Sequence, residues 1–107
     1  MIQYFNKLSP EELERLAILS EELGEAQQVI GKILRHGYES RNPIIDSDTN
    51  RKMLEKELGD VLFAIRFLGF AKDIIIKDIV NFANHKQEKI NQWLHHNTIG
   101  KNNVNSK

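Results

Sequence analysis

Five carboxylates fall in two short groups of the sequence, Glu21-Glu22-Leu23-Gly24-Glu25 and Glu57-Leu58-Gly59-Asp60. Residues three and four apart share one face of an α-helix, so Glu22 and Glu25 are neighbours, as are Glu57 and Asp60. Both groups border apolar residues at helical spacing, and the apolar face of a helix in a soluble protein packs against a core. We therefore expect these acidic side chains to point towards a common interior.

Acidic groups in such a place need a counter-charge. Charge withdrawn from water must be paired, must bind a metal, or must be neutralised by a shift in pKa. A ligand set made of oxygen alone favours a hard cation, Mg²⁺ before Ca²⁺ or Mn²⁺. Two alternatives stay open, because Glu-rich helices are commonly solvated and an internal salt-bridge network could hold the same charges without chemistry. The recurrence of two acidic groups beside apolar residues favours the metal site.

The first acidic group lies inside a long predicted helix. Ser9 can cap its start, Pro10 suits the first helical position and Glu12 completes a capping box. The helix should end near His36, with Gly37 as its C-terminal stop. Its apolar face is expected to hold Leu16, Leu19, Leu23, Ala26, Ile30 and Ile33.

The second acidic group lies inside a second predicted helix, which should begin within residues 47–50 and end near Lys72. The repeated Leu-Gly pair suggests that the two helices pack closely at Gly24 and Gly59. Apolar residues surround this helix on all sides, and such a helix should be buried. We therefore expect a homo-oligomer whose chains share a core, from the spread of Leu54, Leu58, Val61, Leu62, Phe63, Ile65, Phe67, Leu68 and Phe70.

A third helix is predicted from about Lys77 to His95. The β-branched run at residues 74–76 has no second strand to pair with, so we interpret it as a connector. Lys86 lies in the middle of the inward stripe of this helix, where a lysine either extends to solvent or faces the acidic centre or a bound phosphate. The stripe comprises Ile79, Phe82, Ala83, Ile90 and Trp93.

Further polar residues continue the acidic stripes. Lys32, Arg35 and His36 occupy the last turn of the first helix, where positive charge complements the helix dipole. The alternative for Lys32 and Arg35 is anion binding beside the metal. Asn50 falls on the stripe of Glu57, two turns earlier, as a cap, a solvated residue or part of the site.

Composition limits the other classes. The sequence has 107 residues, with 15 Lys and Arg balancing 15 Asp and Glu, so we expect no nucleic-acid or membrane partner. It has no cysteine, which excludes disulfides and thiolate metal sites and fits a cytoplasmic location. No signal peptide or membrane span is apparent. We expect one helical domain over residues 1–97 and a disordered tail over residues 98–107.

The acidic pattern resembles the E-E-x-x-E … E-x-x-D signature of the MazG-like all-α nucleoside triphosphate pyrophosphohydrolases. The resemblance covers roughly residues 9–95, and residues 32–37 and 50–51 also look like small members of that family. It implies an all-α bundle of three main helices per chain, assembled as a homodimer or homotetramer. It also implies Mg²⁺-dependent cleavage of a nucleoside triphosphate to the monophosphate and pyrophosphate, with Mn²⁺ as a substitute.

Carried over by position, the resemblance makes Glu22, Glu25, Glu57 and Asp60 the metal ligands. Glu21 would be a further ligand or would orient the attacking water. The family motif does not fix the nucleobase, and phosphoribosyl-ATP is an alternative substrate with the same reaction type.

Two other classes of protein fit less well. A di-iron carboxylate bundle needs Glu-x-x-His on two helices, and no histidine here follows a glutamate at that spacing. A non-catalytic regulatory or interaction module of the same fold would be expected to lose acidic ligands, and all five are present.

Overall fold

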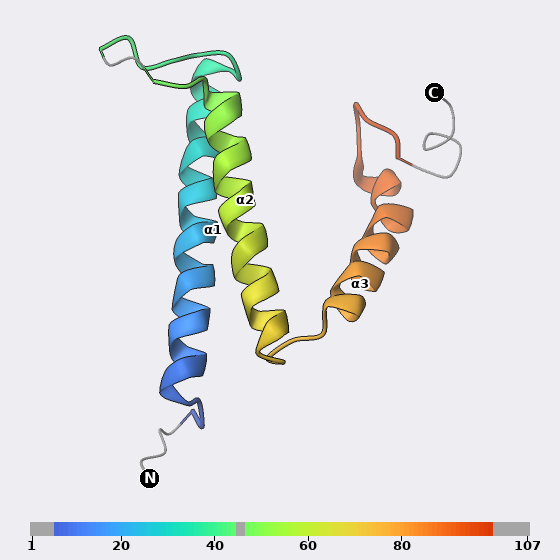
Figure 1. The fold of residues 1–107 in the computed structure, drawn as a ribbon. Coiled ribbons are helices and arrows are strands. Elements are labelled where there is room, and N and C mark those ends of the chain that lie inside the picture. Colours follow the sequence, from blue (N-terminus) through green and yellow to red (C-terminus); the bar gives the residue numbers. More distant parts are fainter. Residues whose placement is uncertain (1–5, 45–46, 100–107) are drawn as a thin grey trace. The chain divides into compact units, whose positions relative to one another are not determined.

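A computed structural model of the chain describes residues 6–44 and 47–99 (Figure 1). It contains α1 (Pro10–His36), α2 (Asn50–Phe70), α3 (Ile76–Lys89) and the short 3₁₀ helix η1 (Ile90–Trp93). The described residues form no strand, and the prediction of an all-α chain with three main helices is confirmed. None of the described helices combines the length and apolar composition that a membrane span requires.

The two ends of α1 are set by local sequence, as predicted. The Ser9 hydroxyl accepts a hydrogen bond of 3.1 Å from the backbone N–H of Glu12, whose carboxylate accepts one of 2.8 Å from the Ser9 N–H. This capping box satisfies amides that the first turn leaves without partners. At the other end Gly37 adopts φ 90°, which favours glycine, and its N–H donates to the Ile33 carbonyl at 2.7 Å.

α1 and α2 run antiparallel and side by side as a helical hairpin (Figure 1). Their contact buries a small core of Ala26, Val29, Ala64 and Leu68. The predicted apolar face of α1 is only partly right, because Leu16, Leu23 and Ile30 are 41%, 51% and 43% exposed. One neighbouring helix covers a narrower strip than the broad apolar stripe of α1.

Hydrogen bonds hold the loop between the helices to the start of α2. This helix begins at Asn50, within the predicted range of residues 47–50. The Thr49 hydroxyl caps α2 by accepting from the Lys52 N–H at 3.2 Å. The backbone N–H groups of Asn50 and Arg51 donate to the carbonyls of Ser40 and Tyr38 at 2.9 and 2.8 Å. The loop thereby uses the amide donors of the first turn of α2.

Hydrogen bonds also link α1 to the turn after α2, at the end of the hairpin that lies away from the loop. α2 ends at Phe70, and Lys72 takes a left-handed conformation with φ 65°. The N–H groups of Lys72 and Asp73 donate back to Gly69 and Leu68 at 3.0 and 2.9 Å, the pattern of a Schellman cap. This turn presents Asp73 to Arg15, which binds it with two hydrogen bonds of 2.6 and 3.0 Å.

The expectation that α1 and α2 pack closely at their glycines is wrong. A Cβ added at Gly24 or Gly59 would meet no atom within 4 Å in the described chain. The small core at Ala26 and Ala64, not the glycines, brings the two helices together. Contacts among the described residues therefore give no packing reason for either glycine, although glycine lowers helix stability relative to alanine.

Residues beyond the hairpin form a second compact unit, and the chain divides into Met1–Ile74 and Ile75–Lys107. The predicted α-helix to His95 is too long, because α3 ends at Lys89 and continues as η1. After η1, the Asn91 side chain exchanges two hydrogen bonds with the backbone of Ile99. The single helical domain over residues 1–97 stays a prediction, and residues 100–107 of the predicted tail lie outside the described residues.

Candidate functional site

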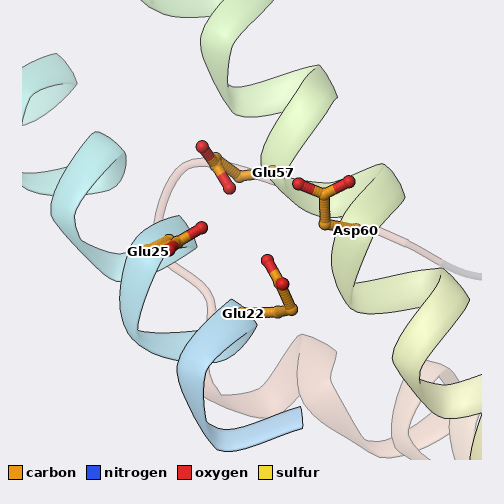
Figure 2. Close-up of side chains that lie close together, drawn as sticks. All are labelled: Glu22, Glu25, Glu57 and Asp60. Atoms are coloured by element: carbon orange, nitrogen blue, oxygen red, sulfur yellow. The ribbon is translucent and has the colours of Figure 1, made fainter. Parts of the chain in front are cut away.

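Four carboxylates meet on one face of the hairpin. Glu22 and Glu25 come from α1, Glu57 and Asp60 come from α2, and Figure 2 shows them pointing towards one another. One oxygen from each lies within 4.8 Å of the oxygens of the others. All four residues are half-buried. The structure thus brings together four of the five predicted acidic residues, whereas Glu21 is exposed and lies outside this four-carboxylate cluster.

The four-carboxylate cluster is poorly satisfied within the described part of the chain. Glu22 Oε1 and Glu57 Oε1 are buried there without any hydrogen-bond partner. A buried acceptor without a partner is uncommon in folded proteins and lowers stability. The two atoms therefore indicate that the cluster is completed by something that donates charge or hydrogen bonds to them.

Lys56 is the cation that contacts the cluster among the described residues. Its Nζ lies 3.5 Å from Asp60 Oδ2 and 4.0 Å from Glu57 Oε2. The Lys56 side chain is 71% exposed, and such surface pairs contribute little to stability. The sequence reasoning missed Lys56, although its spacing of four residues from Asp60 was a usable signal.

Crowding of like charge changes the acidity of Glu25. The charge of Glu22 raises the pKa of Glu25 above its ordinary value, and desolvation and the neighbouring Glu57 raise it further. Glu21 adds a smaller contribution of the same sign. The protein alone therefore disfavours the charged form of Glu25, which a bound cation would instead favour.

The donor set fits a hard divalent cation. It consists of carboxylate oxygens from two helices, two of which lack partners within the described residues. Hard cations such as Mg²⁺ take oxygen ligands of this kind. The cluster can therefore hold a metal ion, whereas the described residues supply it with a single ion-pair partner, Lys56.

A pocket of about 630 Å³ lies beside the loop between α1 and α2. Three predicted substrate-binding residues, Lys32, Arg35 and Asn50, line it together. Asn50 is also structural, because it is 7% exposed and its amide donates to the Gly37 carbonyl at 3.2 Å. The full lining is Lys32, Arg35, His36, Ser40, Arg41, Asn42, Pro43, Ser47, Asn50 and Met53.

Lys86 is the fourth predicted substrate contact. It lies on α3 in the second unit, where its side chain is exposed. Its contact with phosphate or with the acidic centre stays a prediction.

Comparison with models of protein families matches residues 10–95 to the MazG nucleotide pyrophosphohydrolase domain. Comparisons with curated proteins and with solved structures gave no significant match. The family match includes all four clustered carboxylates and the three helices α1, α2 and α3. Because the match spans most of the sequence and confirms the resemblance of the acidic motif, the chain belongs to the MazG nucleotide pyrophosphohydrolase domain family.

Proposed function

We propose that this protein is a Mg²⁺-dependent pyrophosphohydrolase that cleaves a nucleoside or deoxynucleoside triphosphate to the monophosphate and pyrophosphate. The observation that carries the proposal is the four-carboxylate cluster, with its two buried oxygens that lack partners in the described chain. The family match supports the reaction class.

Each acidic residue has a proposed role. Glu22, Glu25, Glu57 and Asp60 would hold Mg²⁺, or Mn²⁺ as a substitute. Mg²⁺ supplies polarisation of the phosphoryl oxygens and a lowered pKa for bound water. Glu21, exposed beside the cluster, would orient the attacking water or add a further ligand.

The substrate carries several negative charges, and the chain offers cations to meet them. Lys32 and Arg35 line the pocket beside the loop, together with Asn50. Lys86 would add a further cation from α3. Phosphate is held well by Arg through paired hydrogen bonds and by Lys through a point charge.

We also propose that the protein works as a homodimer or homotetramer. Leu23, Phe63 and Phe70 are 51%, 57% and 85% exposed, although large apolar side chains at such positions favour burial. A second copy would cover them and complete the core. Light scattering at micromolar concentration should give a multiple of 12.4 kDa, and the mass of one chain would exclude this proposal.

A nucleotide panel tests the reaction. The protein should be incubated with common and modified nucleoside triphosphates, with phosphoribosyl-ATP, and with Mg²⁺ or Mn²⁺, and both pyrophosphate and orthophosphate should be measured. We expect pyrophosphate with at least one nucleotide and none after EDTA. Orthophosphate with a diphosphate product would contradict the proposal, as would inactivity with the whole panel.

A further inference from the structure

The pocket beside the loop has an unusual charge for this chain. Its lining includes Lys32, Arg35, His36 and Arg41, and none of the described residues that line it is acidic. The whole chain has a formal net charge of +0. The remaining lining is mostly neutral and polar, with Pro43 and Met53 as the apolar contributions. The local chemistry is therefore that of an anion-binding pocket.

Most of these basic side chains are free to bind a ligand. Across residues 6–44 and 47–99, Lys32, Arg35 and His36 form no ion pair. Arg41 donates to the Ser47 carbonyl at 2.9 Å, which shapes the loop and leaves its positive charge without a carboxylate partner. By contrast, Arg51 and Lys52, at the same end of the hairpin, bind Glu39 and Glu55 at 2.8 and 3.0 Å.

The anion contacts must come from side chains. The start of α2 is next to the pocket, and helix starts commonly bind anions through their backbone N–H groups. Here those of Asn50, Arg51 and Lys52 already donate to loop carbonyls or to the Thr49 hydroxyl. Because Arg41 already donates to the Ser47 carbonyl, Lys32 and Arg35 are the cationic side chains of the pocket without a hydrogen-bond or ion-pair partner among the described residues.

The pocket and the four-carboxylate cluster follow one another along the hairpin. Lys32 is seven residues after Glu25 and shares its helix face, at a rise of about 10 Å. On α2, Met53 is four residues before Glu57, at a rise of about 6 Å. The long flexible stem of Lys32 can shorten this gap further. A ligand with a linear chain of anionic groups could therefore contact both places.

We infer that this pocket holds the terminal phosphates of the substrate, the part that leaves as pyrophosphate; this rests on the proposed function. In that reaction the water oxygen bonds to the α-phosphorus and a water proton is released to solvent. The bond from that phosphorus to the α–β bridging oxygen breaks, and its electron pair leaves with pyrophosphate. Lys32 and Arg35 neutralise the charge that accumulates on the departing group, and the nucleobase lies away from the loop.

A pocket for the terminal phosphates should give a higher kcat/KM for a nucleoside triphosphate than for the diphosphate, because the diphosphate places one phosphate fewer in the pocket. Pyrophosphate alone should also bind the protein through Lys32 and Arg35. Calorimetric titration of pyrophosphate in the presence of Mg²⁺ measures the second property without turnover.

The test compares Arg35→Ala and Lys32→Ala with Lys52→Ala, whose cation lies at the same end of the hairpin but outside the pocket lining. Each pocket variant should weaken pyrophosphate binding by about 10-fold or more, as loss of a hydrogen bond to a charged group implies. Each should also reduce the triphosphate-to-diphosphate ratio of kcat/KM. Lys52→Ala should change both by less than about twofold. Helical circular dichroism checks that the variants fold, and Arg35→Lys should restore part of the binding.

Unchanged pyrophosphate affinity in both pocket variants of an active protein would overturn the inference and leave the proposed function intact. Weakened binding of the nucleoside monophosphate, with pyrophosphate binding unchanged, would also overturn it, because the pocket would then hold the nucleoside end. A wild-type protein that cleaves no nucleotide overturns the proposed function instead.

Discussion

The hairpin of α1 and α2 carries two acidic sites built in opposite ways. At the end of the hairpin away from the loop, Asp73 receives two hydrogen bonds from Arg15, and both side chains are about 15% exposed. Further along the hairpin, four carboxylates face one another with exposed Lys56 as the cation in contact among the described residues. Arg15 and Asp73 satisfy each other's charge, whereas two buried oxygens of the four-carboxylate cluster lack a hydrogen-bond partner among the described residues.

The two sites also change the pKa of their acids in opposite directions. The hydrogen bonds from Arg15 lower the pKa of Asp73, against a smaller effect of desolvation, and its charge lowers it further. The charge of Glu22, with desolvation and Glu57, raises the pKa of Glu25. Folding thus stabilises the charge of Asp73 and opposes the charge of Glu25. The contrast separates an acid paired within the fold from acids that we propose to bind a metal ion.

The largest expected difference between the two sites is in catalysis. Glu25→Gln or Asp60→Asn should reduce pyrophosphate release by at least about 10–100-fold, the effect that loss of a residue supporting a metal ligand already has. Asp73→Asn should retain the turnover of the folded fraction, because Asp73 lies outside the cluster. Turnover per folded molecule, with the folded fraction taken from circular dichroism, measures the difference. Equal loss in all variants would remove the distinction.

The second-largest effect is expected on the thermal stability of the protein when the Arg15–Asp73 pair is broken. Asp73→Asn should lower Tm at neutral pH, because it leaves the half-buried Arg15 guanidinium without its partner. The pKa of Asp73 is lowered from 3.8, so its charge stabilises the fold above that pH and this contribution is lost as pH falls through the folded pKa. Melts of wild type and variant from pH 7 to pH 2 should converge at the acid end. A constant difference would show that charge is not the cause.

At the four-carboxylate cluster, removal of one charge should leave Tm unchanged or raise it, whereas at the Arg15–Asp73 pair it should lower Tm. In EDTA at neutral pH, Glu25→Gln should melt at the same temperature as wild type or higher, because it removes a charge that the fold opposes. The pKa of Glu25 is raised from 4.5, so its charge destabilises the fold as pH rises above that value and has no effect well below it. The advantage of Glu25→Gln should therefore disappear in acid. Glu14→Gln, at an exposed carboxylate of α1 outside the cluster, is the matched control for the loss of one negative charge.

The smallest effect belongs to Lys56. Since it contacts Asp60 and Glu57 from solvent, it would compete for the same oxygens with a metal ion bound at the proposed site. Lys56→Gln should tighten Mg²⁺ binding by about fivefold at most, the upper range for an exposed ion pair. Titration calorimetry without nucleotide tests this expectation. Weaker Mg²⁺ binding in the variant would mean that Lys56 positions the ligands.

The sequence predicted those features that depend on short spacings. The capping box at Ser9, the stop at Gly37 and the shared face within each acidic pair follow from residues within one or two helical turns. The meeting of the two pairs across the hairpin was expected from the apolar residues that border both of them. The Arg15–Asp73 pair could not be predicted, because its members are 58 residues apart and their meeting depends on the turn at Lys72. The outward direction of Leu16, Leu23 and Ile30 depends on which strip of α1 one neighbouring helix covers. The end of α3 at Lys89, where the chain continues as η1, was not predicted from the sequence.

The central claim is that the four-carboxylate cluster is a metal site, and paired thermal melts of wild type and Glu25→Gln in EDTA and in Mg²⁺ test it most directly. Binding to the native state alone stabilises it by mass action, by about 2.7 kcal/mol when Mg²⁺ exceeds its Kd 100-fold. We expect Mg²⁺ to raise the Tm of wild type clearly and that of Glu25→Gln much less, with the two proteins equally stable in EDTA or the variant more so. A Glu25→Gln protein that is markedly destabilised in EDTA and still active would contradict the metal site and return these carboxylates to a structural role.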